Sequence, residues 1–301
     1  MKFSVIIPVY NAEKTIERVL ASLISNKDYI NEVILVNDRS EDDAFSYIEN
    51  FKSFFDIKVI DNAGKQGPGP ARKTGILAAE SEWITFVDAD DCLTPNSLYY
   101  VSREIEENED IVLLHSQSIY YESGSFTPDT IGQDETSCGG NFYKREFLIE
   151  NQLFPHDDLY MAEDEYFNEI ILIFIDNYFN EENVIHYFDY PVYEVHHDID
   201  RELSFAFSHW TDYLCKYHLL YKSYVIDFFK DIEIKKSLEE DFKNNFIFAY
   251  FLLQGLVQDI ENSFIQTNEL IHFQNALKFY KKTYNKNEDN IIFYYEEERK
   301  S

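Results

Sequence analysis

The chain has 301 residues, and 45% of them are hydrophobic, which is enough for a sizeable core and too many for a wholly disordered protein. Its 56 acidic and 26 basic residues give a net charge of −30 at pH 7. This charge argues against sequence-independent binding to nucleic acid or to an anionic membrane, because both need an excess of Lys and Arg. The simplest consequence is a solvated acidic surface.

The three cysteines, Cys92, Cys138 and Cys215, are far apart and form no CxxC pair. They predict neither a disulfide framework nor a zinc site, and reduced thiols favour a cytoplasmic protein. Residues 1–11 contain one lysine and a short apolar run that stops at Pro8, so we interpret them as a first strand rather than a signal peptide. No run reaches the roughly 20 apolar residues that a transmembrane helix needs.

Apolar runs rich in β-branched residues alternate with segments of helical periodicity in the first part of the chain. This alternation predicts an α/β domain with a mostly parallel sheet flanked by helices. Strands are predicted over 3–9, 32–38, 57–61, 83–87 and 111–116. Helices are predicted after an N-cap at Asn11, from about Pro70 to Ala79, and with Pro95 in the first turn of a third.

Polar residues follow three of these strands, at the edge where parallel sheets bind their ligands. They are Tyr10 with Asn11, Asn37 with Asp38, and Asp88, Asp90 and Asp91 in the stretch WITFVDADD (83–91). Clustered carboxylates repel one another unless a cation neutralises them. Mg²⁺ or Mn²⁺ prefers such oxygen ligands and would stabilise a departing diphosphate. The alternative is a solvated acidic turn, but the position at the end of a strand favours a metal.

Five motifs follow one another in a specific order and spacing: PVYN (8–11), VNDRSEDD (36–43), GPARKTG (69–75), FVDADD (86–91) and AEDEYF (162–167). Together they resemble the motif series of the family 2 glycosyltransferases, which are inverting enzymes with the Rossmann-like GT-A fold. The resemblance covers about residues 1–200. We therefore expect a catalytic domain over 1–203. The strongly helical, aromatic-rich remainder, 204–301, is predicted to be a C-terminal appendix that extends the core, binds acceptor or mediates homo-oligomer formation.

The resemblance implies a set of residues that bind the nucleotide sugar. These are Pro8, Tyr10, Asn11, Asp38, Arg72, Asp88 and Ala89. The first three would line the nucleotide pocket, and Asp38 would bind the base, usually uracil. Asp88 would lie near the ribose and the sugar, and Arg72 would touch the nucleotide or its phosphates. The other interpretation is that Arg72 and Lys73 only neutralise the acidic cluster; Lys73 stands where the family commonly has Asn.

The resemblance also implies the metal ligand and the base. Asp90 would bind the divalent metal, Mn²⁺ or Mg²⁺, that bridges the diphosphate. In YEVHHDIDRELS (193–204) one histidine, His196 or His197, could bind the same metal; neighbouring side chains of a strand point to opposite faces, and we favour His197. Asp164, paired with Glu163, would be the general base. The alternative is that these acidic residues only form the first turn of a helix, where the helix dipole favours them.

The expected protein is thus an inverting hexosyl- or N-acetylhexosaminyltransferase. It would move a sugar from a nucleotide sugar, most simply a UDP-sugar, to a hydroxyl of a glycan, a wall polymer or a lipid-linked acceptor. One alternative is a haloacid-dehalogenase-like phosphatase with Asp88 as nucleophile, although Cys92 interrupts that pattern. The other is a non-catalytic nucleotide-sugar-binding protein of the same fold.

Overall fold

The computed structural model describes residues 1–121, 130–133, 135–179 and 184–196, together with 221, 224, 225, 227–229 and 232. The chain forms two compact units, residues 1–207 and 208–301. All the helices and strands given below belong to the first unit. The helical appendix predicted for 204–301 lies almost entirely outside the described residues, so its boundary and its role remain predictions.

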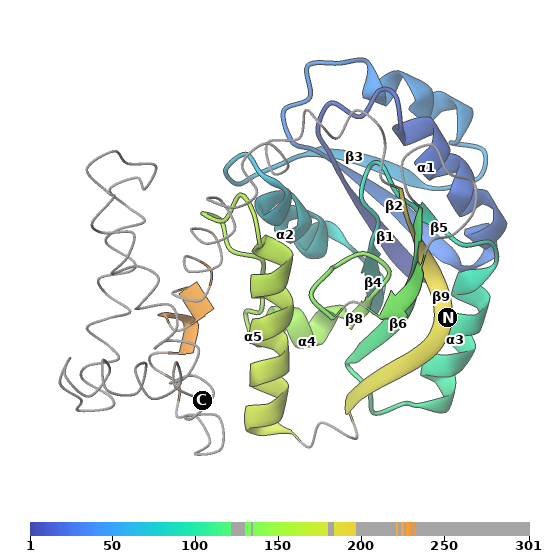
Figure 1. Ribbon diagram of the computed structural model, residues 1–301. Coiled ribbons are helices and arrows are strands. Elements are labelled where there is room, and N and C mark those ends of the chain that lie inside the picture. Colours follow the sequence, from blue (N-terminus) through green and yellow to red (C-terminus); the bar gives the residue numbers. More distant parts are fainter. Residues whose placement is uncertain are drawn as a thin grey trace, which may run out of the picture. The chain divides into compact units, whose positions relative to one another are not determined.

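The first unit is built on one mixed sheet, in which the described residues form nine strands (Figure 1). Its spatial order is β3-β2-β1-β4-β8-β6-β9-β5, and β7 pairs with β6. The strands are Phe3–Val9 (β1), Ile30–Asn37 (β2), Ile57–Asp61 (β3), Trp83–Phe86 (β4), Cys92–Leu93 (β5), Leu113–Tyr121 (β6), Thr130–Gln133 (β7), Phe142–Lys144 (β8) and Ile185–His196 (β9). Strands β1 to β4 pair in parallel, β8 is antiparallel to β4 and β6, β9 is parallel to β6, and β5 is antiparallel to β9.

Helices cover both faces of this sheet. Figure 1 shows α1 and α3 on one side and α2, α4 and α5 on the other. The α-helices are Ile16–Leu23 (α1), Pro68–Ala78 (α2), Ser97–Glu107 (α3), Arg145–Glu150 (α4) and Glu163–Tyr178 (α5). Two 3₁₀ segments, Ile24–Tyr29 (η1) and Ala44–Asn50 (η2), follow α1 and β2.

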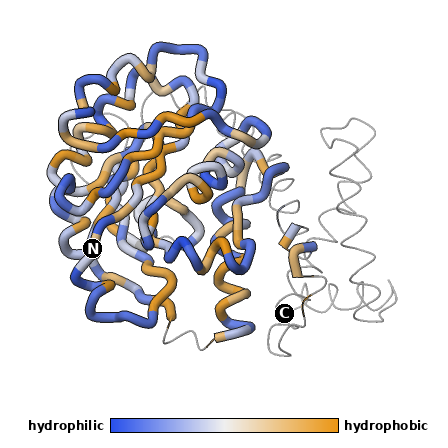
Figure 2. The backbone as a smooth tube through the Cα atoms, turned by 180° about the vertical axis from the view of Figure 1, so that it is seen from behind, coloured by the Kyte–Doolittle hydropathy of each residue, from blue (hydrophilic) through white to orange (hydrophobic). Residues whose placement is uncertain are grey.

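The two-residue period of β1 divides the core between the two faces. Phe3, Val5, Ile7 and Val9 belong to the same cluster as the buried faces of α1 and α3. Ile6 points the other way, to α2. A Cβ atom added to Gly75 in this helix would lie 2.3 Å from the Cγ2 atom of Ile6. Figure 2 shows the hydrophobic positions gathered in the central strands. Gly75 therefore lets α2 pack closely on the sheet beside the polar edge.

The predicted α/β fold, a mostly parallel sheet flanked by helices, is confirmed. Strands expected at 3–9 and 57–61 occur with those bounds, and those expected at 32–38, 83–87 and 111–116 are observed at 30–37, 83–86 and 113–121. The four strands β5, β7, β8 and β9, and the antiparallel pairing that they introduce, were not predicted.

Two predicted helix starts are wrong. Helix α1 begins at Ile16 rather than after Asn11, because Asn11 adopts a left-handed backbone with φ 49°. Helix α3 begins at Ser97, so Pro95 precedes the helix instead of lying in its first turn. Between them Asn96 is left-handed, with φ 58°, which starts the helix one residue later. Among the described residues, no helix has the length and apolar character required to span a membrane.

Candidate functional site

The loops that follow β1, β2 and β4 lie side by side at one edge of the sheet, as the sequence predicted. The N–H group of Asp38, just after β2, donates to the carbonyl of Val9 at the end of β1, at 2.8 Å. The N–H group of Val87, just after β4, donates to the carbonyl of Ile6 in β1, at 3.0 Å. The polar residues that come next in each loop therefore share one edge.

The segment after β1 carries three of the predicted nucleotide-binding residues. Pro8 is half-buried within the strand, and Tyr10 is 51% exposed just beyond it. Asn11 is exposed, and it fastens the loop after β2: its N–H donates to Ser40 Oγ at 3.1 Å, and its Oδ1 accepts from the N–H of Glu41 at 2.8 Å. Tyr10 thus presents an aromatic ring at the open edge of the sheet, on a loop that Asn11 holds in place.

Asp38 is a buried carboxylate that joins β2 to the start of α2. Its Oδ2 accepts from the N–H of Gly67 at 2.8 Å, and its Oδ1 accepts from Asn62 Nδ2 at 2.5 Å. Burial raises the pKa of Asp38, and these two hydrogen bonds act in the opposite direction. The carboxylate therefore fixes the loop before α2 while lying at the polar edge.

Arg72, from the first half of α2, is the cation that the acidic cluster needs. Its guanidinium is buried, and Nη2 donates to Asp88 Oδ1 at 2.8 Å while Nη1 donates to Glu163 Oε1 at 2.7 Å. Lys73 does not share this role, since its Nζ pairs with Asp157 at 3.1 Å. One side chain thus joins the loop after β4 to the first turn of α5, two segments far apart in sequence. These contacts agree with the interpretation of Arg72 as a cation that neutralises the acidic cluster.

Asp164 lies half-buried in the first turn of α5, one residue after Glu163. Its Oδ1 accepts from the N–H of Glu165 at 3.1 Å. Burial is the main cause that raises the pKa of Asp164 to about 7; the charges of Glu163 and Asp88 add to this, and Arg72 opposes it. A carboxyl group with this pKa can accept a proton at neutral pH, as a general base must. The acidic first turn of a helix, the alternative interpretation, is present as well.

The loop Asp88–Ala89–Asp90 is held from α1 through its backbone. Thr15 Oγ1 donates to the carbonyl of Ala89 at 2.6 Å, and Arg18 Nη2 donates to the carbonyl of Asp90 at 2.5 Å. Both aspartates are half-buried, and 37% of the Asp88 side chain is exposed. Carboxylate oxygens on a fixed loop at the open edge are a suitable donor set for Mg²⁺ or Mn²⁺.

Asp91 has a part in the site that the sequence did not reveal. It is only 4% exposed; its Oδ2 accepts from the Tyr193 hydroxyl at 2.9 Å and its Oδ1 from the N–H of His196 at 2.8 Å. The Tyr193 hydroxyl in turn accepts from the N–H of Asp88 at 3.0 Å. Asp91 therefore locks the loop after β4 to β9. The sequence signal was the fourth residue of DADD, but its partners are about a hundred residues away.

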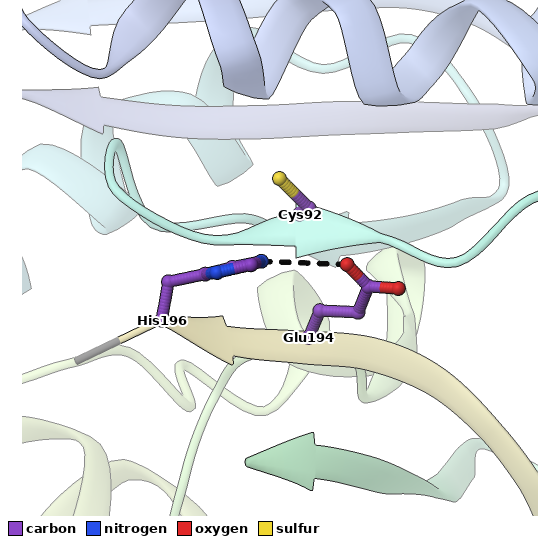
Figure 3. Close-up of side chains that lie close together, drawn as sticks. All are labelled: Cys92, Glu194 and His196. Atoms are coloured by element: carbon purple, nitrogen blue, oxygen red, sulfur yellow. Dashed lines mark hydrogen bonds and ion pairs between the residues drawn. The ribbon is translucent and has the colours of Figure 1, made fainter. Parts of the chain in front are cut away.

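The two histidines considered as metal ligands have different outcomes. The ring of His196 lies beside Cys92 and Glu194, and its Nε2 is 3.3 Å from Glu194 Oε2 (Figure 3). His197, which we favoured, lies outside the described residues.

Comparisons with known proteins bear on the family and the fold of the chain. The sequence profile described as glycosyl transferase family 2 matches residues 4–170, which is more than half of the chain. Among curated proteins, the chain is 29% identical over 187 residues to the poly(ribitol-phosphate) β-N-acetylglucosaminyltransferase TarS of Staphylococcus aureus; the match covers 56% of this chain and 32% of TarS. It is 28% identical over 194 residues to the minor teichoic acid biosynthesis protein GgaA of Bacillus subtilis, covering 56% of this chain and 43% of that protein.

The chain therefore spans about a third of the length of TarS and less than half of the length of GgaA. Among solved structures, residues 1–349 of S. aureus TarS in complex with UDP-GlcNAc superpose with a TM-score of 0.66 at 22% sequence identity, covering 93% of this chain and 81% of that one. This likeness confirms the GT-A fold that the motif series led us to expect. From the family profile, we conclude that the chain belongs to glycosyl transferase family 2.

Proposed function

We propose that this chain transfers a hexose or an N-acetylhexosamine from a UDP-sugar to a hydroxyl group of a cell-wall polymer, with inversion at the anomeric carbon. Two relatives support this choice by their names, a poly(ribitol-phosphate) N-acetylglucosaminyltransferase and a teichoic acid biosynthesis protein. The solved TarS structure with UDP-GlcNAc supports the donor. The observation that carries the proposal is the Arg72 bridge, which places Asp88 and the acidic start of α5 in one site.

The acceptor side of the reaction belongs to Asp164. Its carboxylate would take the proton of the acceptor hydroxyl, and the oxygen would then attack the anomeric carbon as the bond to the diphosphate breaks. One displacement of this kind inverts the anomeric centre and needs no nucleophile from the enzyme. The pKa of about 7 keeps a fraction of Asp164 ionised at neutral pH and gives it enough basicity to accept a proton.

The donor side belongs to the edge formed by β1, β2 and β4. We propose that Pro8, Tyr10 and Asn11 line the nucleotide pocket, that Asp38 recognises the base, and that Asp88 with Ala89 meets the ribose and the sugar. Arg72 would contact the nucleotide or its phosphates through N–H groups other than the two that bind Asp88 and Glu163. Asp90 would hold Mn²⁺ or Mg²⁺, and a divalent cation bound there supplies positive charge to the leaving diphosphate. His197 remains a proposed ligand.

We set the phosphatase alternative aside. The nucleophile of such phosphatases follows the first strand of the domain, whereas Asp88 follows β4 and is bonded to Arg72. We also propose a cytoplasmic location, which the free thiols of Cys92 and Cys138 support. The proposed homo-oligomer would form through the helices after residue 203, outside the described residues.

A donor panel followed by a transfer assay tests the proposal. Thermal unfolding of the purified protein is measured with UDP-, GDP-, CMP- and dTDP-sugars, each with and without Mn²⁺, and transfer is then measured to wall-polymer and lipid-linked acceptors. We expect stabilisation by UDP-sugars alone and transfer that Asp164→Asn abolishes without loss of donor binding. Glu165→Gln, in the same helical turn, is the matched control and should keep its activity. Donor binding without turnover by the wild type would contradict transfer and favour the non-catalytic alternative.

A further inference from the structure

Three potential metal ligands lie together on one face of the β5–β9 strand pair. In the antiparallel register Cys92 is directly opposite Glu194, and opposite residues of a pair have their side chains on the same face. His196 is two residues further along β9, so it shares that face as well. From sequence alone the isolated Cys92 gave no reason to expect a soft-metal site. The pairing of β5 with a strand a hundred residues later brings the three side chains together.

The ligand atoms of these three side chains are close enough to share one ion. The Cys92 sulfur, a Glu194 carboxylate oxygen and a His196 ring nitrogen all lie within 4.8 Å of one another. The Glu194 and His196 atoms are already 3.3 Å apart (Figure 3). Ligands around tetrahedral zinc lie roughly 3.3–3.8 Å apart, from its bond lengths. The ligand atoms are thus at most about 1–1.5 Å further apart than around zinc, and rotation of the flexible Glu194 and His196 side chains can close this difference.

The neighbouring residues hold His196 in position and leave the cluster accessible to solvent. The His196 ring is stacked on Tyr121, its neighbour in β6, at 5.0 Å between centroids and 5° between planes. The backbone N–H of His196 is bonded to Asp91. Cys92 is buried, whereas the side chains of Glu194 and His196 are each 22% exposed. An ion can therefore enter from solvent, and a water molecule can supply a fourth ligand.

We propose that Cys92, Glu194 and His196 form a binding site for Zn²⁺, separate from the site for a hard cation at Asp90. One thiolate, one imidazole and one carboxylate suit zinc, because thiolate favours Zn²⁺ over Mg²⁺ or Mn²⁺. Binding replaces the proton of the Cys92 thiol by the metal and releases that proton to solvent.

The bound ion would act on the loop that carries the donor-binding aspartates. A zinc ion would join β5 to β9 through three protein ligands and add to the link that Asp91 makes with β9. It would thereby stabilise the position of Asp88 and Asp90 without taking part in the transfer.

Titration of the metal-free, full-length protein with Co²⁺ alone, and then with Zn²⁺ alone, tests this site. Co²⁺ bound to a thiolate gives a charge-transfer absorption band in the near ultraviolet, and Zn²⁺ displaces it. We expect one equivalent of Co²⁺ to give this band, and Cys92→Ser to abolish it. Glu194→Gln and His196→Gln, at half-buried positions, should fold normally and weaken Zn²⁺ binding by at least about tenfold.

Two control variants separate this site from other thiols and from the donor site. Cys138→Ser removes another buried free thiol and should leave the band unchanged. Asp90→Asn should also leave it unchanged while it weakens Mn²⁺-dependent donor binding. Wild-type protein that gives no thiolate band would overturn the proposal, as would a band that survives Cys92→Ser or is lost in Asp90→Asn. None of these measurements depends on sugar transfer, so failure of the transferase proposal would appear separately.

Discussion

At the scale of single residues, one buried guanidinium determines the electrostatics of the site. Arg72 neutralises Asp88 and Glu163 with two separate hydrogen bonds, and its Nε has no hydrogen-bond partner among the described residues. Removal of one partner of a buried ion pair leaves an unpaired charge, which is far more costly than the loss of an exposed pair.

We therefore expect Arg72→Met to lower the free energy of unfolding by about 3–5 kcal/mol at pH 7. Arg72→Lys should be intermediate, because an ammonium group keeps the charge but lacks the fork that reaches both carboxylates. Urea denaturation followed by circular dichroism measures the difference. Lys73→Met is the adjacent control, because Lys73 forms a half-exposed ion pair. It should lower the free energy of unfolding by less than about 1 kcal/mol. Equal losses for Met at the two positions would contradict the buried bridge.

If Asp164 is the general base, as proposed, the pH dependence of the transfer reaction can be predicted. Its pKa is raised to about 7, and only the ionised form can accept the proton of the acceptor. We expect kcat/KM to rise with pH through about 7 and to level off above it, since deprotonation creates the active base. Initial rates between pH 5.5 and 9 with a saturating donor measure this profile. A profile that falls as pH rises, or an Asp164→Asn variant that still transfers sugar with the wild-type pH profile, would contradict the assignment of the base.

The residues of the site were only partly predictable from the sequence. The motif series brought Asp38, Asp88 and Asp164 to attention because each follows a recognisable local pattern. The contacts of Arg72 with two carboxylates, and of Asp91 with β9, depend on segments that meet only after folding. Sequence spacing carries no information on such encounters.

At the scale of elements, the predicted strands have a clear pattern in their own sequence, whereas the unpredicted strands depend on partners elsewhere in the chain. Strands β1 to β4 are apolar runs with helices between them, so periodicity reveals them. By contrast, β5 has two residues and β8 has three, and each counts as a strand only because of its partners. The two helix starts were misplaced because left-handed asparagines, Asn11 and Asn96, precede them. Asparagine is enriched in this conformation, but it is also a favoured N-cap, so the residue type alone does not distinguish the two.

The connection between β9 and the loop after β4 gives a prediction at this scale. Tyr193→Phe keeps the ring but removes the hydroxyl that serves both Asp91 and the N–H of Asp88. The loss leaves two buried polar groups short of a partner, so we expect thermal unfolding to show a destabilisation of about 1–3 kcal/mol. The KM for the donor should also rise.

An exposed tyrosine provides the matched control for this substitution. Tyr99 is 43% exposed and has ring contacts with two other tyrosines, which Tyr99→Phe preserves. We expect this variant to match the wild type in both stability and KM. A Tyr193→Phe variant indistinguishable from Tyr99→Phe would show that the hydroxyl does not hold the loop.

At the scale of the whole molecule, the net charge of −30 would affect which acceptors can approach the proposed transferase. A polyanionic acceptor such as a poly(ribitol phosphate) chain would be repelled at long range, and salt screens this repulsion within roughly 10 Å at 0.1 M. We expect the KM for such a polymer to fall as ionic strength rises from about 10 to 150 mM, a change of the Debye length from roughly 30 to 8 Å.

A short uncharged acceptor with the same hydroxyl is the control for this measurement, and its KM should not change with ionic strength. A KM for the polyanion that rises with salt would instead require a local basic surface for the acceptor. That surface would have to overcome the excess of acidic residues in the chain as a whole.

The Arg72 bridge has a kinetic consequence for the proposed transferase. The same guanidinium binds Asp88 on the proposed donor side and Glu163 beside the proposed base. The donor side and the acceptor side of the site are therefore linked through Arg72. A UDP-sugar that draws Asp88 toward itself would leave Arg72 to Glu163 alone and alter the field at Asp164. We therefore expect an ordered addition in which the donor enters first and prepares the enzyme to activate the incoming alcohol.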